Sequence, residues 1–180
     1  MTEYFNNYFD LLDEKIRCVS HLELIKVSGL IDQAHKKKGK IIIIGNGGSA
    51  AIASHASIDL TKAAKIRSIN FNESSLLTCL SNDYGYEHWA EKAIEFYADS
   101  NDLIILISSS GQSKNIINAA LKVKDMGISL VTLSGFSKNN KLRALGDINL
   151  WVDCSKYNIV ETVHQTWILS VIDQLIHIKE

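Results

Sequence analysis

Two pairs of titratable side chains are spaced so that the members of each pair can share one face of a helix. His55 and Asp59 are four residues apart in one helix-like stretch, and Glu161 and His164 are three apart in another near the C-terminus. Side chains three or four residues apart lie on the same side of an α-helix. Two imidazoles and two carboxylates could transfer protons at the carbonyl group of a ligand, or they could bind a divalent metal such as zinc.

A turn of small residues precedes the first pair. The apolar run KIIIIG ends in GNGGSA at 45–50, and a helical pattern follows. GNGGSA fits the G-x-G-x-x-[GA] pattern of dinucleotide-binding turns. The acidic residue that should bind a ribose about 20 positions later is not clearly present, since Asp59 is too early and Glu73 is late. This turn is therefore the one sequence feature in favour of a nicotinamide-dependent oxidoreductase, and the missing acidic residue argues against it. We expect no nucleotide cofactor.

A second turn, SSSGQS at 108–113, follows the apolar run DLIILI and precedes another helical pattern. Its hydroxyls and backbone N–H groups, next to a helix N-terminus, could bind one phosphate. The alternative is a serine-rich loop in which Ser113 caps the helix. Two such turns at one sheet edge favour a small phosphorylated ligand, with its phosphate on the second turn. The pattern G-x-x-x-x-G-K-[ST] does not occur, which excludes an NTP-binding P-loop.

The elements that must position these residues are short apolar runs that alternate with helical patterns. KIIIIG, DLIILI, ISLVTLSG and INLWVD are each followed by small or polar residues and a helical pattern. Continuous β-branched runs of this kind indicate strands buried on both faces of a parallel sheet. We therefore predict an α/β fold, a doubly wound and mainly parallel sheet flanked by helices. We expect one domain over residues 1–180, with an N-terminal helical segment at 1–38 and an α/β core at 39–180.

The N-terminal helical segment is longer than is needed to cover the sheet of a doubly wound core. Phe5, Phe9, Leu12 and Ile16 recur at intervals of three and four, as in an amphipathic helix. We expect these positions to form a seam between subunits.

The composition excludes several classes of partner. Nineteen basic residues against twenty acidic residues give a net charge of -1, so the chain has no electrostatic footprint for nucleic acid or an anionic membrane. No apolar stretch approaches the roughly 18 to 20 residues of a membrane span. The acidic N-terminus lacks the basic start of a secretory signal, and the three scattered cysteines are typical of reduced thiols. We therefore expect a cytoplasmic protein.

Four motifs in their order along the chain resemble those of one family. GNGGSA, NDYG at 82–85, SSSGQS and LSG at 133–135 are similar to the sugar isomerase (SIS) domain, and more narrowly to the phosphoheptose isomerases. Members convert sedoheptulose 7-phosphate to a heptose 7-phosphate as homotetramers with active sites at subunit interfaces, and many bind zinc. The motifs suggest these substrate-binding residues: Asn46, Gly47, Gly48, Ser49, Asn82, Asp83, Ser108, Ser109, Ser110, Gln112 and Ser113.

The resemblance also implies roles for the two helical pairs. Isomerisation moves a proton between C1 and C2 through an enediol, which requires a base and an acid. We assign Asp59, Glu161 and His164 to catalysis, and His55, Asp59, Glu161 and His164 to a possible zinc site. The family has Glu at the position of Asp59, commonly Gln at that of Glu161, and His eight residues later, where this chain has Leu169.

These departures fall among the candidate catalytic and metal-binding residues, and the phosphate-binding turn at 108–113 is unchanged. Phosphosugar binding is therefore better supported than any reaction. From the resemblance we predict a phosphosugar aldose–ketose isomerase that supplies heptose for a surface polysaccharide. The alternative is a non-catalytic SIS-domain protein that binds phosphosugars or regulates another process.

Overall fold

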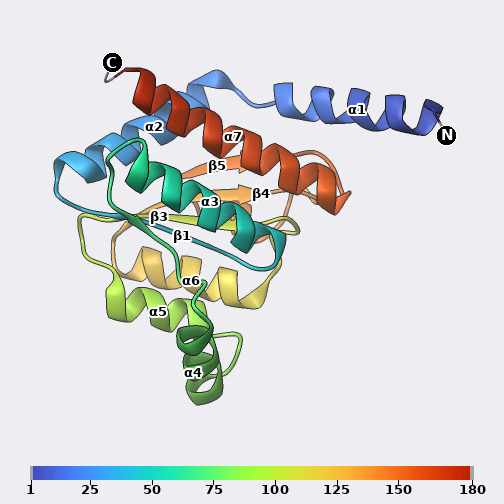
Figure 1. Ribbon diagram of the computed structural model, residues 1–180. Helices are drawn as coiled ribbons and strands as arrows, with labels where there is room; N and C mark the ends of the chain where they lie inside the picture. Colours follow the sequence, from blue (N-terminus) through green and yellow to red (C-terminus); the bar gives the residue numbers. More distant parts are fainter. Residues whose placement is uncertain (1, 179–180) are drawn as a thin grey trace.

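The computed structural model describes residues 2–178, and over this range it contains one five-stranded parallel sheet (Figure 1). The strand order is β2-β1-β3-β4-β5. The bounds are β1 (Ile41–Gly45), β2 (Ser68–Ile69), β3 (Leu103–Ser108), β4 (Ser129–Ser134) and β5 (Ile148–Trp151). This arrangement confirms the predicted doubly wound α/β fold.

The central strands end at the same level of the sheet. Gly45 of β1 pairs with Ile107 of β3, and Ser108 of β3 pairs with Ser134 of β4. Every residue of β1 and β3 is buried, as their unbroken apolar sequences require in a sheet covered on both faces. The segments after β1, β3 and β4 therefore begin side by side at one edge.

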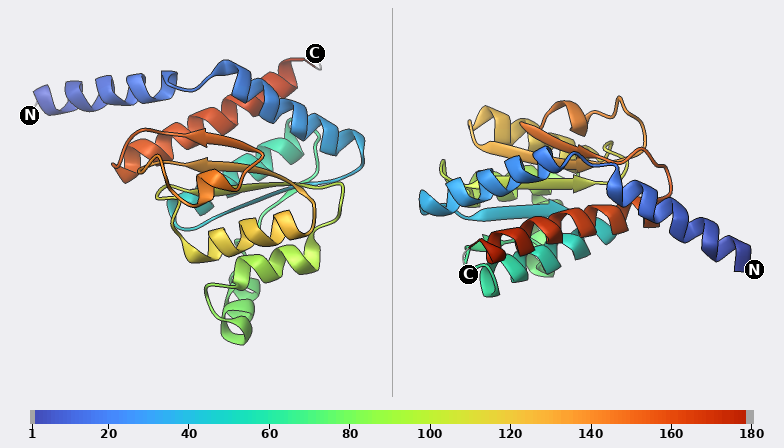
Figure 2. Two further views of the ribbon diagram at one scale, coloured as in Figure 1. Left: turned by 180° about the vertical axis from the view of Figure 1, so that it is seen from behind. Right: turned by 90° about the horizontal axis from the view of Figure 1, so that it is seen from above.

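Helices form a layer on each face of the sheet (Figures 1 and 2). On one face, α2 (His21–Lys36), α3 (Gly48–Lys62) and α7 (Tyr157–His177) enclose a core with alternate residues of β1 and β3. On the other, α5 (Trp89–Tyr97) and α6 (Lys114–Asp125) enclose a second core. Beyond α5, α4 (Ser74–Tyr84) extends away from the sheet.

The connection from β4 to β5 differs from the expected helical pattern. It forms only a short 3₁₀ turn, η1 (Leu142–Ala144), within an otherwise irregular segment. The stretch SKNN at 137–140 contains residues whose side chains compete with the backbone for hydrogen bonds and favour turns over helices.

Helix α1 (Thr2–Arg17) projects from the body of the molecule (Figures 1 and 2). Every one of its residues is at least partly exposed, and Phe5 and Phe9 are more than half exposed. Leu12 and Ile16 instead pack partly against the core, and the Ile16 carbonyl accepts a 2.8 Å hydrogen bond from Trp167 Nε1. Of the four residues predicted to form a seam, Phe5 and Phe9 are therefore largely exposed, whereas Leu12 and Ile16 are partly covered by the same chain.

Candidate active site

The two small-residue turns meet at the carboxyl edge of the sheet. Asn46, directly after β1, and Asn115, in the first turn of α6, exchange two amide hydrogen bonds of 3.0 and 2.9 Å. Asn115 is buried, and the Tyr86 hydroxyl donates to Asn46 Oδ1 over 3.3 Å. The expected neighbourhood of the turns is thus fixed by a side-chain link.

A cavity of about 440 Å³ opens beside this link. It is of the size that binds small ligands. Residues from both turns and from the segment after α4 line it: Asn46, Gly85, Tyr86, Glu87, Ser113, Lys114 and Asn115. The sequence reasoning missed Tyr86, Lys114 and Asn115. Their proximity to the NDYG and SSSGQS motifs was the available signal.

Three carbonyl oxygens of the turn at 108–113 accept hydrogen bonds from N–H groups of the protein. The Ser108 carbonyl accepts the Gly111 N–H at 2.9 Å, within the turn. The Ser109 carbonyl accepts from Gly135 at 2.9 Å, and the Gly111 carbonyl accepts from Leu142 at 3.1 Å. With these acceptors occupied, the hydroxyls of Ser110 and Ser113 and the N-terminus of α6 are the groups that could meet an anion.

The hydroxyls of this turn are not used to cap α6. Ser113 occupies the N-cap position, but its side chain makes no capping hydrogen bond. It instead accepts a 3.2 Å hydrogen bond from Ser108 Oγ, and Ser110 Oγ accepts from the Gln112 N–H at 3.2 Å. This geometry favours an anion site over the simple capping alternative.

Glu161 lies where the two turns come together. Ser109 Oγ donates to Glu161 Oε1 over 3.4 Å. A Cβ atom at Gly48, in the first turn of α3, would collide with the same carboxylate. A carboxylate at a helix N-terminus is electrostatically favourable. Glu161 is therefore a base candidate held between the turn that begins α3 and the phosphate turn.

His55 and Asp59 form a pair on α3, with 3.1 Å between His55 Nε2 and Asp59 Oδ2. Their side chains are 49% and 37% exposed. Gln165 of α7 lies beside them, with its Nε2 atom 3.1 Å from His55 Nδ1. Gln165 is a further residue that the sequence reasoning missed, although its place four residues after Glu161 puts both on one face of α7.

His164 does not join the other three candidates, which corrects the expected four-residue cluster. It is 0% exposed, and its Nε2 atom is 3.1 Å from the Ser134 carbonyl oxygen. Burial lowers its pKa to about 4, against a smaller opposing effect of the hydrogen bond to Ser134. Helix α7 contacts both α3 and the sheet, and neighbouring residues of an α-helix point about 100° apart, so Gln165 faces α3 while His164 faces the core.

The residues present do not fit the expected zinc site. Within residues 2–178, no three or more His, Cys, Asp or Glu side chains are grouped so that they could bind a metal ion. His55 and Asp59 supply only two donors, His164 faces the core, and Leu169 packs among apolar side chains.

Asn82 and Asp83 are placed differently from the other substrate-binding candidates. Both are exposed on α4, where Asn82 Nδ2 donates to Asp83 Oδ1 at 2.9 Å. They do not line the cavity, whereas Gly85 and Tyr86, which follow them, do. The NDYG motif thus reaches the site through its last glycine and the residue after it.

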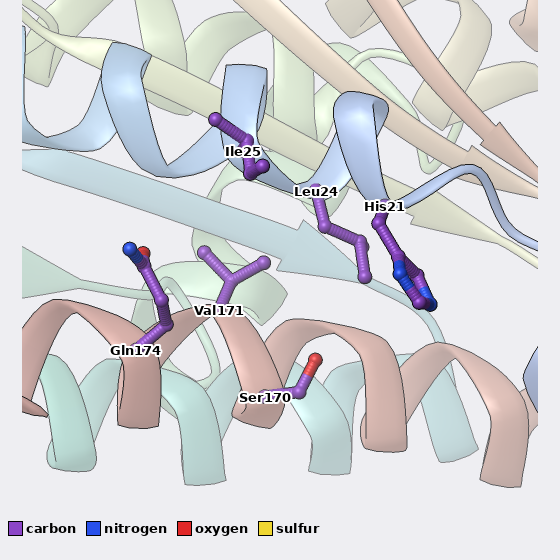
Figure 3. A pocket seen from close by; sticks show the side chains of 6 residues that line it. All are labelled: His21, Leu24, Ile25, Ser170, Val171 and Gln174. Carbon is purple, nitrogen blue, oxygen red and sulfur yellow. The ribbon is translucent and has the colours of Figure 1, made fainter.

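A second hollow lies between α2 and α7 (Figure 3). Its volume is about 200 Å³, and it is lined by His21, Leu24, Ile25, Ser170, Val171 and Gln174. Leu24 and Val171 point toward each other across it (Figure 3). Its apolar lining suits a hydrophobic side chain rather than a phosphorylated ligand.

Comparison with known proteins gives a consistent family. The SIS-domain profile matches residues 3–135. A phosphoheptose isomerase of Helicobacter pylori (strain Shi470) is 35% identical over 141 residues, covering 75% of this chain and 73% of the relative. That of Aliarcobacter butzleri is 35% identical over 147 residues, covering 78% and 77%.

A solved structure shares the fold over nearly its whole length. The phosphoheptose isomerase of Neisseria gonorrhoeae matches with a TM-score of 0.88 and 25% identity, covering 97% of this chain and 96% of that one.

Among the helices of residues 2–178, none combines the length and apolar character that crossing a membrane demands.

Proposed function

This chain belongs to the SIS-domain family and, within it, to the phosphoheptose isomerases, and we propose that it converts sedoheptulose 7-phosphate to a heptose 7-phosphate. The observation that carries the proposal is the contact of Glu161 with both small-residue turns. One turn offers hydroxyls and a helix N-terminus to a phosphate, and the carboxylate that lies between this turn and Gly48 can serve as a base on the sugar.

In this proposal the sugar phosphate spans the two turns. The phosphate binds at 108–113, and the sugar chain extends past Asn46 and Tyr86, which are joined by a hydrogen bond. Polar side chains on the cavity wall suit the hydroxyls of a sugar. Heptose for a surface polysaccharide is the proposed use of the product.

Glu161 is the proposed base. It removes a proton from C1 of the ketose, the electron pair forms the C1–C2 double bond of an enediol, and the C2 oxygen gains a proton. Return of a proton to C2 and loss of the C1 hydroxyl proton then give the aldose. We assign the oxygen protons to His55 and Asp59, because Gln165 places this pair one turn along α7 from Glu161.

Glu161→Gln tests the assignment, with Thr162→Ala at the adjacent exposed position as the control. Loss of a general base should lower kcat for sedoheptulose 7-phosphate by about 10²- to 10⁴-fold, while binding of inorganic phosphate is retained. NMR of the sugar carbons would follow the conversion. A wild-type protein that binds sugar phosphates but converts none, with or without added zinc, would leave the binding-protein alternative.

We also propose a homotetramer in the cytoplasm. The exposed Phe5 and Phe9 of α1 and the apolar hollow of Figure 3 are surfaces that a second copy of the chain could cover. The three cysteines are free thiols, which suits a reducing compartment. Light scattering at micromolar concentration should give four times the chain mass, and a monomeric mass would contradict the assembly.

A further inference from the structure

Asn140 lies buried behind the phosphate turn, in the irregular segment between β4 and η1. Only 2% of its surface is exposed. Its Nδ2 group donates to the carbonyl oxygens of Ser137 at 2.8 Å and Gly135 at 3.1 Å, and to Ser134 Oγ at 3.2 Å. Its Oδ1 atom accepts the Arg143 N–H at 2.9 Å. One side chain thus ties together both ends of the segment.

The segment held by Asn140 is also the one that receives the carbonyls of the phosphate turn. The Gly135 N–H binds the Ser109 carbonyl at 2.9 Å, and the Leu142 N–H binds the Gly111 carbonyl at 3.1 Å. Gly135 and Leu142 lie on either side of Asn140 along the chain.

The Asn140 carboxamide packs directly on the turn as well. A Cβ atom at Gly111 would collide with it, and Gly111 has a φ of +63°, a conformation that favours glycine. Gly111 therefore allows both the sharp turn and the close approach of Asn140.

We infer that Asn140 is a positioning residue that keeps the phosphate turn in its anion-binding conformation. A carbonyl that rotated toward the ligand would present partial negative charge to a phosphate, and Asn140 prevents this by fixing the N–H groups that bind those carbonyls. The inference rests on the proposed phosphate site at 108–113. It predicts that Asn140 controls phosphate affinity although it is buried behind the turn.

The hydrogen-bond partners of Asn140 require a side chain with both a donor and an acceptor, as a carboxamide has. Nδ2 faces three oxygen atoms, whereas Oδ1 faces an N–H group. Asn140→Asp keeps the shape and the acceptor but places an oxygen against three oxygens. Asn140→Ala removes all four hydrogen bonds, and Asn140→Ser can restore one donor.

The experiment measures inhibition by inorganic phosphate, together with KM and kcat for sedoheptulose 7-phosphate. In Asn140→Ala and Asn140→Asp, the inhibition constant of phosphate and KM should each rise about tenfold, the size of effect expected from losing buried hydrogen bonds. Asn140→Ser should show a smaller rise, and kcat should change less than twofold. Asn139→Ala, at the exposed neighbouring position, is the control and should match the wild type.

A cycle with Ser110→Ala separates positioning from general destabilisation. If Asn140 acts through the turn, the losses of phosphate affinity in Ser110→Ala and Asn140→Ala should not add in the double variant. Additive losses, or folded Asn140 variants with wild-type phosphate affinity, would overturn the inference. If Asn140→Ala does not fold, Asn140→Ser carries the same comparison. Failure of the wild type to bind phosphate would refute the phosphate site itself.

Discussion

The two small-residue turns begin alike but provide different environments. Each follows a buried parallel strand and opens a helix at the same sheet edge. At the turn that opens α3, the Glu161 carboxylate lies against Gly48. At 108–113, the N–H groups of Gly135 and Leu142 bind two of the carbonyls, and the Glu161 carboxylate contacts the start of the turn, where it accepts from Ser109 Oγ over 3.4 Å.

The difference shows that the packing partner, rather than the turn sequence, decides which ligand a glycine-rich turn can bind. A pyrophosphate at the start of α3 would meet the Glu161 carboxylate, and like charges repel. The dinucleotide interpretation of GNGGSA is therefore disfavoured although the motif itself is present. One turn is suited to hold a base and the other is suited to an anion.

The largest expected effect comes from disturbing the base and not the anion site. Gly48→Ala would place a Cβ atom where the Glu161 carboxylate lies, and the carboxylate must move. Misplacing a catalytic group by about 1 Å can cost about 10²-fold in rate, so kcat should fall by that order. The inhibition constant of inorganic phosphate should stay within twofold of the wild type.

Gly29→Ala is the matched control, because a Cβ atom at that position of α2 would meet nothing within 4 Å. It should leave kcat unchanged. Equal losses of kcat in the two variants, or a Gly48→Ala enzyme with normal turnover, would contradict the placement of Glu161.

The next effect concerns His164, which supports the second turn from the same helix that brings Glu161 to the first. Its hydrogen bond to Ser134 lies next to Gly135, whose N–H binds Ser109. Its pKa is about 4 in the folded protein and 6.5 for an unperturbed histidine, so the unfolded chain takes up the proton first. Stability is therefore fully present above pH 6.5 and is lost as the pH falls toward 4.

This difference in pKa corresponds to roughly 3 kcal/mol of unfolding free energy. The difference in unfolding free energy between pH 7 and pH 4.5, measured by urea unfolding, should contain most of this contribution. His164→Gln keeps an amide that can donate to the Ser134 carbonyl but cannot titrate, so it should have a smaller pH dependence. An unchanged pH dependence in this variant would show that other groups cause the loss.

A smaller effect is expected from the hydroxyls of the phosphate turn. Ser110→Ala and Ser113→Ala should each weaken phosphosugar binding by about 1 to 2 kcal/mol, as for a lost hydrogen bond to a charged group. The kcat value should be retained, the opposite of the result expected for Gly48→Ala. Calorimetric titration with the sugar phosphate is the measurement, and unchanged affinity in the double variant would remove this turn from the site.

The fold and the two turns could be predicted from the sequence because their signals are local. The run IIIIG can be recognised as a buried strand, and SSSGQS lies just before a helix. The direction of His164 could not be predicted, because α7 faces α3 and the sheet at once. Asn140 gave no signal either, since its partners become visible only when the segment after β4 folds behind the phosphate turn.

The smallest effect should come from breaking the link between the turns. Asn115→Ala removes both hydrogen bonds that join the turns and adds no charge near the phosphate. At about 0.5 kcal/mol for each bond, the low end for neutral groups, KM for the sugar phosphate should rise about fivefold. Inorganic phosphate touches only the second turn in our proposal, so its inhibition constant should not change. The exposed Lys114 precedes Asn115 in α6 and lines the same cavity. Lys114→Ala should therefore give a different pattern, in which the inhibition constant of phosphate and KM rise together. Equal changes of both constants in Asn115→Ala would mean that the two turns act as one site and that the comparison between them does not hold.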